Sequence, residues 1–73
     1  MIEVRLFAGL RQGRQKTYQM EPDSIQTVQD IMDVLSIQRS EVNILLINGF
    51  HQKPETEVKD GDIVSLFPAV GGG

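Results

Sequence analysis

The first twenty residues of the chain alternate between apolar and polar side chains. Apolar residues occupy every second position over residues 2–8, and Phe7 is the one bulky apolar side chain on the opposite parity. A period of two is typical of a strand with one face on a core. A second alternation over residues 15–21 predicts an antiparallel partner, joined to the first strand by a connection of hairpin length at residues 9–13.

One helix is expected after this hairpin. Thr27 and Asp30 have the spacing of a capping box, and Ser24 is a competing N-cap one turn earlier. Apolar residues then recur at i, i+3, i+4 and i+7, which predicts a helix with one buried stripe. That stripe consists of Val28, Ile31, Met32 and Leu35. Asp30 and Asp33 form a carboxylate pair on the polar face, which we interpret as acids favoured by the helix dipole and not as an acid/base site.

The last third of the chain predicts further strands. Residues 43–47 form a continuous apolar run, typical of a strand that is covered on both faces or exposes one apolar face. Asn48-Gly49 predicts a type I′ turn into a brief strand at residues 50–52. The turn residues 60–62 lead into a last strand at 63–67, and we expect pairing to fade at Pro68, which lacks a backbone donor.

This order of elements predicts an α+β fold in which a mixed four- to five-stranded sheet wraps one helix, as in the β-grasp arrangement. Seventy-three residues suffice for one small domain, which we place at residues 1–70, with 71–73 as a flexible glycine tail. The predicted core consists of Ile2, Val4, Leu6, Tyr18, Met20, Val28, Ile31, Met32, Leu35, Ile37, Leu45, Ile47, Val58, Val64 and Leu66.

The composition argues against several classes of function. A net charge of −3 argues against nucleic acid as the main partner, because phosphate binding needs a positive field. The absence of cysteine excludes a disulfide, a thiolate metal site and a thiol nucleophile. No apolar run approaches the length of a membrane span and the first residues lack a signal-peptide pattern, so we expect a soluble, cytoplasmic protein without a membrane partner.

Other candidate chemistry is sparse. His51 is the only imidazole, and with Glu55 and Glu57 it offers a loose set of loop ligands, so neither a metal site nor a bound cofactor is predicted, and the role of His51 stays open. The first sixteen residues gather four basic side chains, which suit either a solvated hairpin or a docking patch. These are Arg5, Arg11, Arg14 and Lys16.

Both ends of the chain resemble the MoaD/ThiS family of ubiquitin-like sulfur carriers. Residues 4–11 (VRLFAGLR) are similar to the opening strand of MoaD-type chains. Residues 60–68 resemble the end of the small subunit of molybdopterin synthase, whereas residues 70–73 (VGGG) are more similar to the thiamine-pathway carrier. The resemblance covers nearly the whole chain and implies a β-grasp fold with the first and last strands parallel at its centre.

The resemblance also implies a mechanism and partners. In the family, the terminal glycine carboxylate, here Gly73, is adenylated with ATP by a ubiquitin-activating-type adenylyltransferase and becomes a thiocarboxylate. Gly71 and Gly72 would form the slender arm that carries it. The chain would then be a monomer when free and a carrier, not an enzyme. Its sulfur would pass to molybdopterin, thiamine or tungsten-cofactor synthesis, with the large subunit of molybdopterin synthase or a thiazole synthase as further partners.

Two alternatives stay open at this point. The chain could be a modifier conjugated to other proteins through Gly73, or a non-covalent β-grasp interaction module. In any of these roles, strand parity predicts a partner surface. If Val64 and Leu66 point into the core, then Phe67 points outward, and Ile44 and Leu46 do the same on the neighbouring strand. In the resembled family the phenylalanine before the proline lies at the interface with the activating enzyme, so the predicted partner residues are Ile44, Leu46, Phe67 and Pro68.

Overall fold

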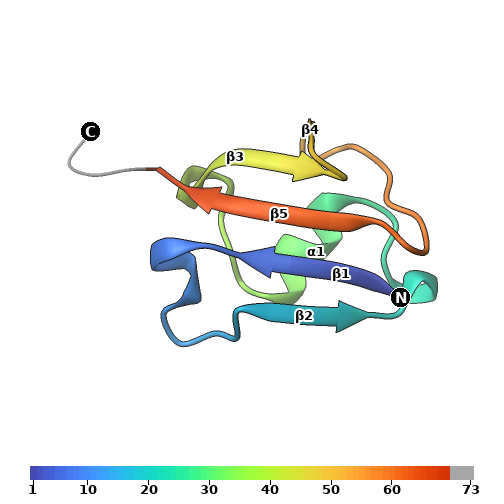
Figure 1. The fold of residues 1–73 in the computed structure, drawn as a ribbon, viewed down its shortest axis with the longest axis horizontal. Coiled ribbons are helices and arrows are strands. Elements are labelled where there is room, and N and C mark those ends of the chain that lie inside the picture. The colour runs from blue at the N-terminus through green and yellow to red at the C-terminus, as the bar shows by residue number, and fades with distance from the viewer. Residues whose placement is uncertain (70–73) are drawn as a thin grey trace.

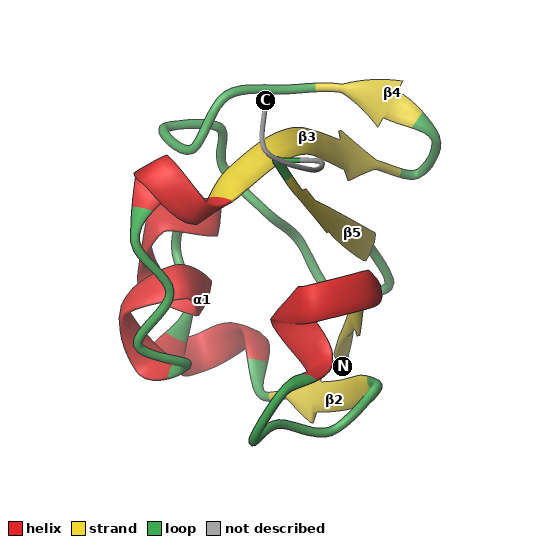
Figure 2. Ribbon diagram, turned by 90° about the vertical axis from the view of Figure 1, so that its left-hand side faces the viewer, coloured by secondary structure: helices red, strands yellow, loops and turns green. Residues whose placement is uncertain are grey.

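The computed structural model describes residues 1–69 as a five-stranded sheet with one α-helix packed on one of its faces (Figures 1 and 2). In chain order the elements are β1 (Ile2–Leu6), the 3-10 turn η1 (Ala8–Arg11), β2 (Thr17–Met20), η2 (Pro22–Ser24), α1 (Val28–Val34), η3 (Arg39–Glu41), β3 (Val42–Ile47), β4 (Phe50–His51) and β5 (Ile63–Pro68). The strands follow the order β2-β1-β5-β3-β4 across the sheet. The predicted α+β architecture is confirmed.

The centre of the sheet is a parallel pair formed by β1 and β5. Val4 lies opposite Val64, and Leu6 lies opposite Leu66. All four side chains are fully buried. The other strands pair antiparallel, β2 with β1, β3 with β5 and β4 with β3. The carboxyl ends of β1 and β5 therefore lie on the same side of the molecule (Figure 1).

The core agrees with the prediction except at a few positions. All the predicted core residues are buried apart from Tyr18, Met20 and Leu35, which are half-buried and pack against the core from the sheet edge and the helix end. Leu10 and Ile25 are buried although the alternation did not predict them. Leu10 lies in η1 and Ile25 directly follows η2, so neither belongs to an element with a repeating pattern.

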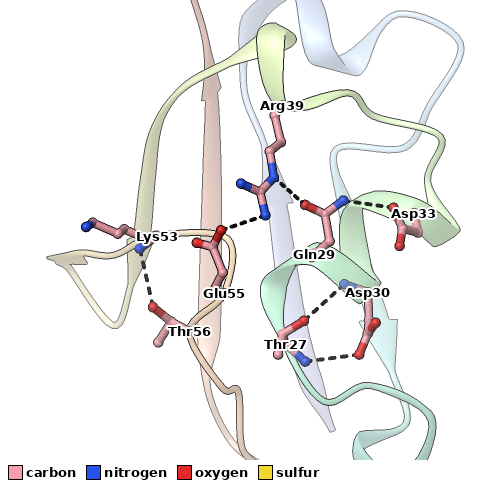
Figure 3. A network of polar contacts seen from close by, with 8 residues as sticks. All are labelled: Thr27, Gln29, Asp30, Asp33, Arg39, Lys53, Glu55 and Thr56. Atoms are coloured by element: carbon pink, nitrogen blue, oxygen red, sulfur yellow. Dashed lines mark hydrogen bonds and ion pairs between the residues drawn. The ribbon is translucent and has the colours of Figure 1, made fainter.

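The capping box predicted at the start of α1 is present. The Thr27 hydroxyl accepts a hydrogen bond from the Asp30 amide at 3.4 Å, and the Asp30 carboxylate accepts from the Thr27 amide at 3.1 Å (Figure 3). Ser24 does not act as the cap, because its hydroxyl donates to the carbonyl of Glu21. The Asp30 carboxylate is thus occupied by backbone amides, in agreement with its interpretation as a structural acid.

The polar segment 53–57 completes the cap from a distant part of the chain. The Thr56 carbonyl accepts from the Val28 amide at 3.1 Å, and the Pro54 carbonyl accepts from the Gln29 amide at 2.9 Å. These are first-turn amides of α1, which have no partner inside the helix. The segment, irregular in sequence, therefore has a defined structural role.

An exposed ion pair adds to this contact. The Arg39 guanidinium donates to the Glu55 carboxylate at 2.8 Å and to the Gln29 side chain at 2.7 Å (Figure 3). The pKa of Glu55 lies below its ordinary value, because its own backbone amide and then Arg39 donate to the carboxylate. Ion pairs this exposed contribute little to stability, so the backbone bonds to α1 matter more.

The end of α1 is a Schellman motif. Ser36 adopts a left-handed conformation with φ of 56°. The Ile37 amide donates to the Met32 carbonyl at 2.8 Å, and the Ser36 amide donates to the Asp33 carbonyl. This turn directs Ile37 into the core, as the sequence predicted.

Arg14 caps the same helix end from outside. Its guanidinium donates to the carbonyls of Leu35 at 3.1 Å and Ser36 at 3.2 Å, and also to the Leu10 carbonyl at 3.1 Å. A cation suits this place because helix carbonyls leave partial negative charge there. Arg14 therefore joins the first hairpin to α1.

The turn at Asn48-Gly49 has positive φ at both residues, 53° and 88°, as a type I′ turn requires. All five strands differ from their predicted bounds, and among them β1 ends earlier, at Leu6, and β3 begins one residue earlier, at Val42. β2 and β4 are shorter than expected, and β5 continues through Pro68, which lies opposite Val42 after a register shift in β3. A proline at a strand end still offers its carbonyl, so pairing continues one residue further. None of the helices among residues 1–69 is long and apolar enough to cross a membrane.

Candidate functional site

The two sides of β5 differ sharply in burial. Val64 and Leu66 have no exposed surface, whereas Ser65 and Phe67 between and after them are half-buried. Because successive strand residues point to opposite faces, Phe67 lies on the face away from α1. The predicted parity of this strand is therefore confirmed.

Two apolar residues of β3 share that face with Phe67. Ile44 lies directly opposite Phe67, and Leu46 lies opposite Ser65. Both are half-buried, while Leu45 and Ile47 on the other parity are buried. The register thus brings together three of the four residues that the sequence predicted for a partner surface.

A fourth apolar residue completes this surface. The ring of Phe7 stacks on the ring of Phe67, with centroids 4.3 Å apart and planes 9° apart. The Phe7 amide donates to the Leu66 carbonyl at 3.2 Å, which extends the β1–β5 pairing by one residue. We call Phe7, Ile44, Leu46 and Phe67 the outer patch.

Phe7 was missed as a site residue by sequence reasoning, although a signal was present. Its parity differs from that of Leu6, so in a strand it must face away from the core. The parallel register of β1 and β5 then places it beside Phe67. The outward parity of Phe7 was therefore the sequence signal for its contact with Phe67.

Arg11 covers the other side of this aromatic pair. The carbon of its guanidinium lies 5.4 Å from the Phe7 ring centroid, within the range of a cation–π contact. Its Nε donates to the Leu6 carbonyl at 2.7 Å, which holds the guanidinium over the ring. Ala8, with φ of 50°, begins the turn that brings Arg11 back over Phe7.

Pro68 does not join the outer patch. It is half-buried and lies opposite Val42, which packs against the core, so its side chain is on the α1 side of the sheet. The predicted reactive residue Gly73 and the arm residues Gly71 and Gly72 lie outside the described residues. The last described residue, Ala69, is exposed and directly follows β5, one residue beyond Pro68.

Three of the four basic side chains of the first hairpin make contacts within the fold. Arg14 is bound to helix carbonyls, and Arg11 is bound to Leu6 and Phe7. Arg5 donates to Glu3, and this bond, with a second one from Gln19, lowers the pKa of the Glu3 carboxyl below its ordinary value. These arginines are thus largely engaged within the fold.

His51 lies opposite Leu46 on the edge strand β4 and is exposed. Within residues 1–69, no group of three or more histidine and carboxylate side chains is arranged to hold a metal ion. The position of His51 therefore does not indicate a chemical role for it. His51 borders the outer patch through its neighbour Leu46.

The family of the chain follows from its match to a family model. The ThiS family model matches residues 4–73, which is nearly the whole chain. The chain belongs to the ThiS family. No match is found among curated proteins.

Solved structures of similar chains confirm the β-grasp fold of this ThiS family member. SAMP1 from Haloferax volcanii is 27% identical, with a TM-score of 0.74 over 99% of this chain and 98% of that chain. The HVO 2177 protein of the same organism is 32% identical, with a TM-score of 0.73 over 99% of this chain and 85% of that chain.

A third similar chain comes from the complex of subunits 1 and 2 of the molybdopterin-converting factor from Helicobacter pylori. It is 23% identical, with a TM-score of 0.66 over 99% of this chain and 97% of that chain, and this likeness shows the fold alone. The family match, with the likeness to SAMP1, identifies the chain as a sulfur carrier of the ThiS and MoaD kind or a small modifier of the SAMP kind. Proteins of the ThiS and MoaD kind are carriers and not catalysts.

Proposed function

We propose that the chain is a sulfur carrier whose Gly73 carboxylate is activated with ATP and converted to a thiocarboxylate. The observation that supports this most directly is the family match, which runs through Gly73 itself. A carboxylate is a poor electrophile because its charge is delocalised, so activation must come first. The carboxylate attacks the α-phosphate of ATP and pyrophosphate leaves, which forms an acyl-adenylate.

Sulfur then replaces the adenylate. A persulfide sulfur attacks the acyl carbon and AMP leaves, and a thiol cleaves the resulting acyl disulfide to release the thiocarboxylate. The chain has no cysteine, so the persulfide and the thiol come from other molecules. Gly71 and Gly72 give the arm its narrow cross-section, because glycine lacks a Cβ.

The outer patch is the proposed docking surface for the activating enzyme. It contains two stacked aromatic rings, and aromatic side chains are enriched among the residues that dominate binding energy. Phe67 precedes the arm by a few residues, so a partner that holds the patch also receives the arm. The proposed receivers of sulfur are a molybdopterin synthase large subunit or a thiazole synthase, and the specific pathway is open among molybdopterin, thiamine and tungsten cofactors.

A second candidate function is a protein modifier attached through Gly73. The likeness to SAMP1, named as a small archaeal modifier protein, favours this second candidate. Both candidates share the adenylation step. They differ in the nucleophile that follows, a persulfide in one case and an amine of another protein in the other.

One experiment separates these functions. The protein is incubated with ATP, its cognate activating enzyme and a sulfur donor, and its intact mass is measured. Replacement of one oxygen by sulfur supports the carrier, and covalent adducts on other proteins support the modifier. If neither sulfur incorporation nor covalent adducts on other proteins are found, only a non-covalent interaction module remains.

The position of the carboxylate is tested in the same assay. Deleting Gly73, or adding one residue after it, should abolish activation and leave the thermal midpoint unchanged, because the arm lies beyond the last strand. Normal activation of the extended protein, with the extension still present by mass, would refute the assignment of Gly73.

A further inference from the structure

The strand β2 forms one edge of the sheet, at the opposite end from β4 (Figure 1). It pairs only with β1, in a register that places Val4 opposite Tyr18 and Ile2 opposite Met20. An edge strand has one row of backbone groups without a partner strand and is a template for pairing with another chain.

The ladder shows which backbone groups lie on the open edge. The Leu6 amide donates to the Lys16 carbonyl at 2.8 Å, so that pair is hydrogen-bonded. Bonded pairs alternate with non-bonded pairs in an antiparallel ladder, so Tyr18 and Met20 also bond to β1. The amides and carbonyls of Thr17 and Gln19 therefore point away from the sheet.

An open cleft with both polar and apolar lining residues lies beside this edge. Its lining includes Tyr18 and Met20 from β2 and Val34 and Leu35 from the end of α1. Val34 is 64% exposed, one of few large hydrophobic side chains in residues 1–69 that are left so open to solvent. A strand added to β2 would place every second side chain over these four residues.

Among the described residues, the lining of the cleft carries one charged side chain, and it is basic. This side chain is Arg14. Three donor bonds of the Arg14 guanidinium go to backbone carbonyls, so two of its five N–H groups remain for another acceptor. Lys16 is exposed at the same end of β2 as Arg14. Glu21 directly follows the other end of β2, and Asp33 on α1, which accepts from the Gln29 side chain, keeps its negative charge.

From these observations we propose that β2 and the end of α1 form a second docking site, for an extended peptide segment of a partner protein. The segment adds as a strand along Thr17 and Gln19, places alternate aliphatic side chains on Tyr18, Met20 and Val34, and carries acidic residues that meet Arg14 and Lys16. Main-chain bonds supply affinity in such strand addition, and the side-chain pockets and charges supply selectivity.

The site is separate from the outer patch and from Gly73. The cleft belongs to the α1 side of β2, whereas the outer patch lies on the opposite face over β5 and β3. Its test uses the free protein without ATP or an activating enzyme, so failure of the carrier function would not affect the result.

The test is a titration of isotope-labelled protein with a short synthetic peptide that alternates valine and threonine and has aspartates at both ends, followed by backbone amide NMR. We expect saturable shifts confined to β2, the end of α1 and the Arg14 turn. A peptide with a central valine replaced by proline should not bind, because its backbone cannot pair as a strand. Lysines in place of the aspartates should weaken binding about tenfold.

Two pairs of variants isolate the contacts. Gln19→Pro removes the outward-pointing amide, whereas the control Gln19→Ala keeps it, so only the first should lose binding. Val34→Asp should weaken binding about tenfold or more, and Phe50→Asp, at an equally exposed apolar residue near the other sheet edge, should have no effect. The thermal midpoint of each variant shows that it is folded, and Val34→Asp keeps the test decisive if Gln19→Pro unfolds.

Three results of the titration would overturn the proposal. They are an absence of shifts at millimolar peptide, shifts centred on the outer patch, and equal binding by Val34→Asp and the parent. Dimerisation that rises with protein concentration and is lost in Gln19→Pro would also overturn it, because the edge would then belong to a second copy of the chain.

Discussion

Leu66 and Phe67 are neighbours on β5, but their side chains differ in burial. The Leu66 side is closed by α1 and has no exposed surface. The Phe67 side is covered only in part, by one stacked aromatic ring and two aliphatic residues of β3. The inner face is buried by the chain itself, whereas burial of the outer face is left incomplete. A single strand thus separates residues that hold the fold from residues that we propose to contact a partner.

The largest expected effect comes from the inner face. Leu66→Ala should lower the free energy of unfolding by about 2 to 5 kcal/mol, because it removes buried methyl groups and leaves a cavity in the centre of the sheet. Urea unfolding measures this loss, and Ser65→Ala on the other face is the matched control. A loss below about 1 kcal/mol would show that the inner face is less tightly packed than its burial indicates.

On the outer face, a substitution should weaken binding more than it lowers the free energy of unfolding. Phe67→Ala should weaken binding to the activating enzyme by roughly 2 kcal/mol or more, the usual threshold for a dominant interface residue. Its loss of unfolding free energy should be smaller than that of Leu66→Ala. Calorimetric titration measures the affinity, and Phe50→Ala, exposed and outside the outer patch, is the control. Loss of fold with unchanged affinity per folded molecule would assign Phe67 to the core instead.

The contact between Phe7 and Phe67 should be measurable in the free protein. A double-mutant cycle with Phe7→Leu and Phe67→Leu should give a coupling of about 0.5 to 1.5 kcal/mol in unfolding free energy, the range for stacked aromatic pairs. Leucine keeps an apolar side chain at each position, so the coupling reports the stacking itself. A coupling indistinguishable from zero would mean that the two rings act independently.

The smallest effect is expected for Glu3, an acidic residue of β1. Donor bonds from Arg5 and Gln19 hold the pKa of Glu3 below its ordinary value, so its contribution to stability is present above the pKa of the unfolded chain. That contribution disappears as the pH falls through the lower pKa of the folded protein. Urea unfolding at several pH values should therefore show the parent slightly more stable than Glu3→Gln near neutral pH. The two proteins should converge in strong acid, and a constant difference at all pH values would contradict this origin.

Features that depend on neighbouring residues were predictable from the sequence. The capping box at Thr27 and Asp30, the turn at Asn48-Gly49 and the parity of β5 each follow from residues a few positions apart. The composition of residues 71–73 predicts a glycine arm in the same local way, and this stays a prediction because the arm lies outside the described residues. The resemblance to a known family added the assignment of Gly73, which physical patterns do not supply.

Features that depend on distant residues were not predictable in this way. The cap that Arg14 forms on α1 joins residues more than twenty positions apart, and Phe7 meets Phe67 across nearly the whole chain. Leu10 and Ile25 are buried because the chain around them folds over the core, and no period in the sequence marks them. Sequence periodicity reports which face of an element is apolar, but tertiary packing decides what covers it.

The parallel pairing of β1 with β5 also bears on how the protein is made. The first strand reaches its central partner only when residues 63–68 are available, so the sheet cannot close while the last part of the chain is still inside the ribosome. Contacts between such distant residues also slow folding, because a long loop must close before they form. Until then β1 and β2 are a hairpin with an uncovered apolar face, and an isolated hairpin has little stability in water. Folding is therefore expected to wait until β5 has left the ribosome, and a truncated chain that lacks β5 should be removed by proteases.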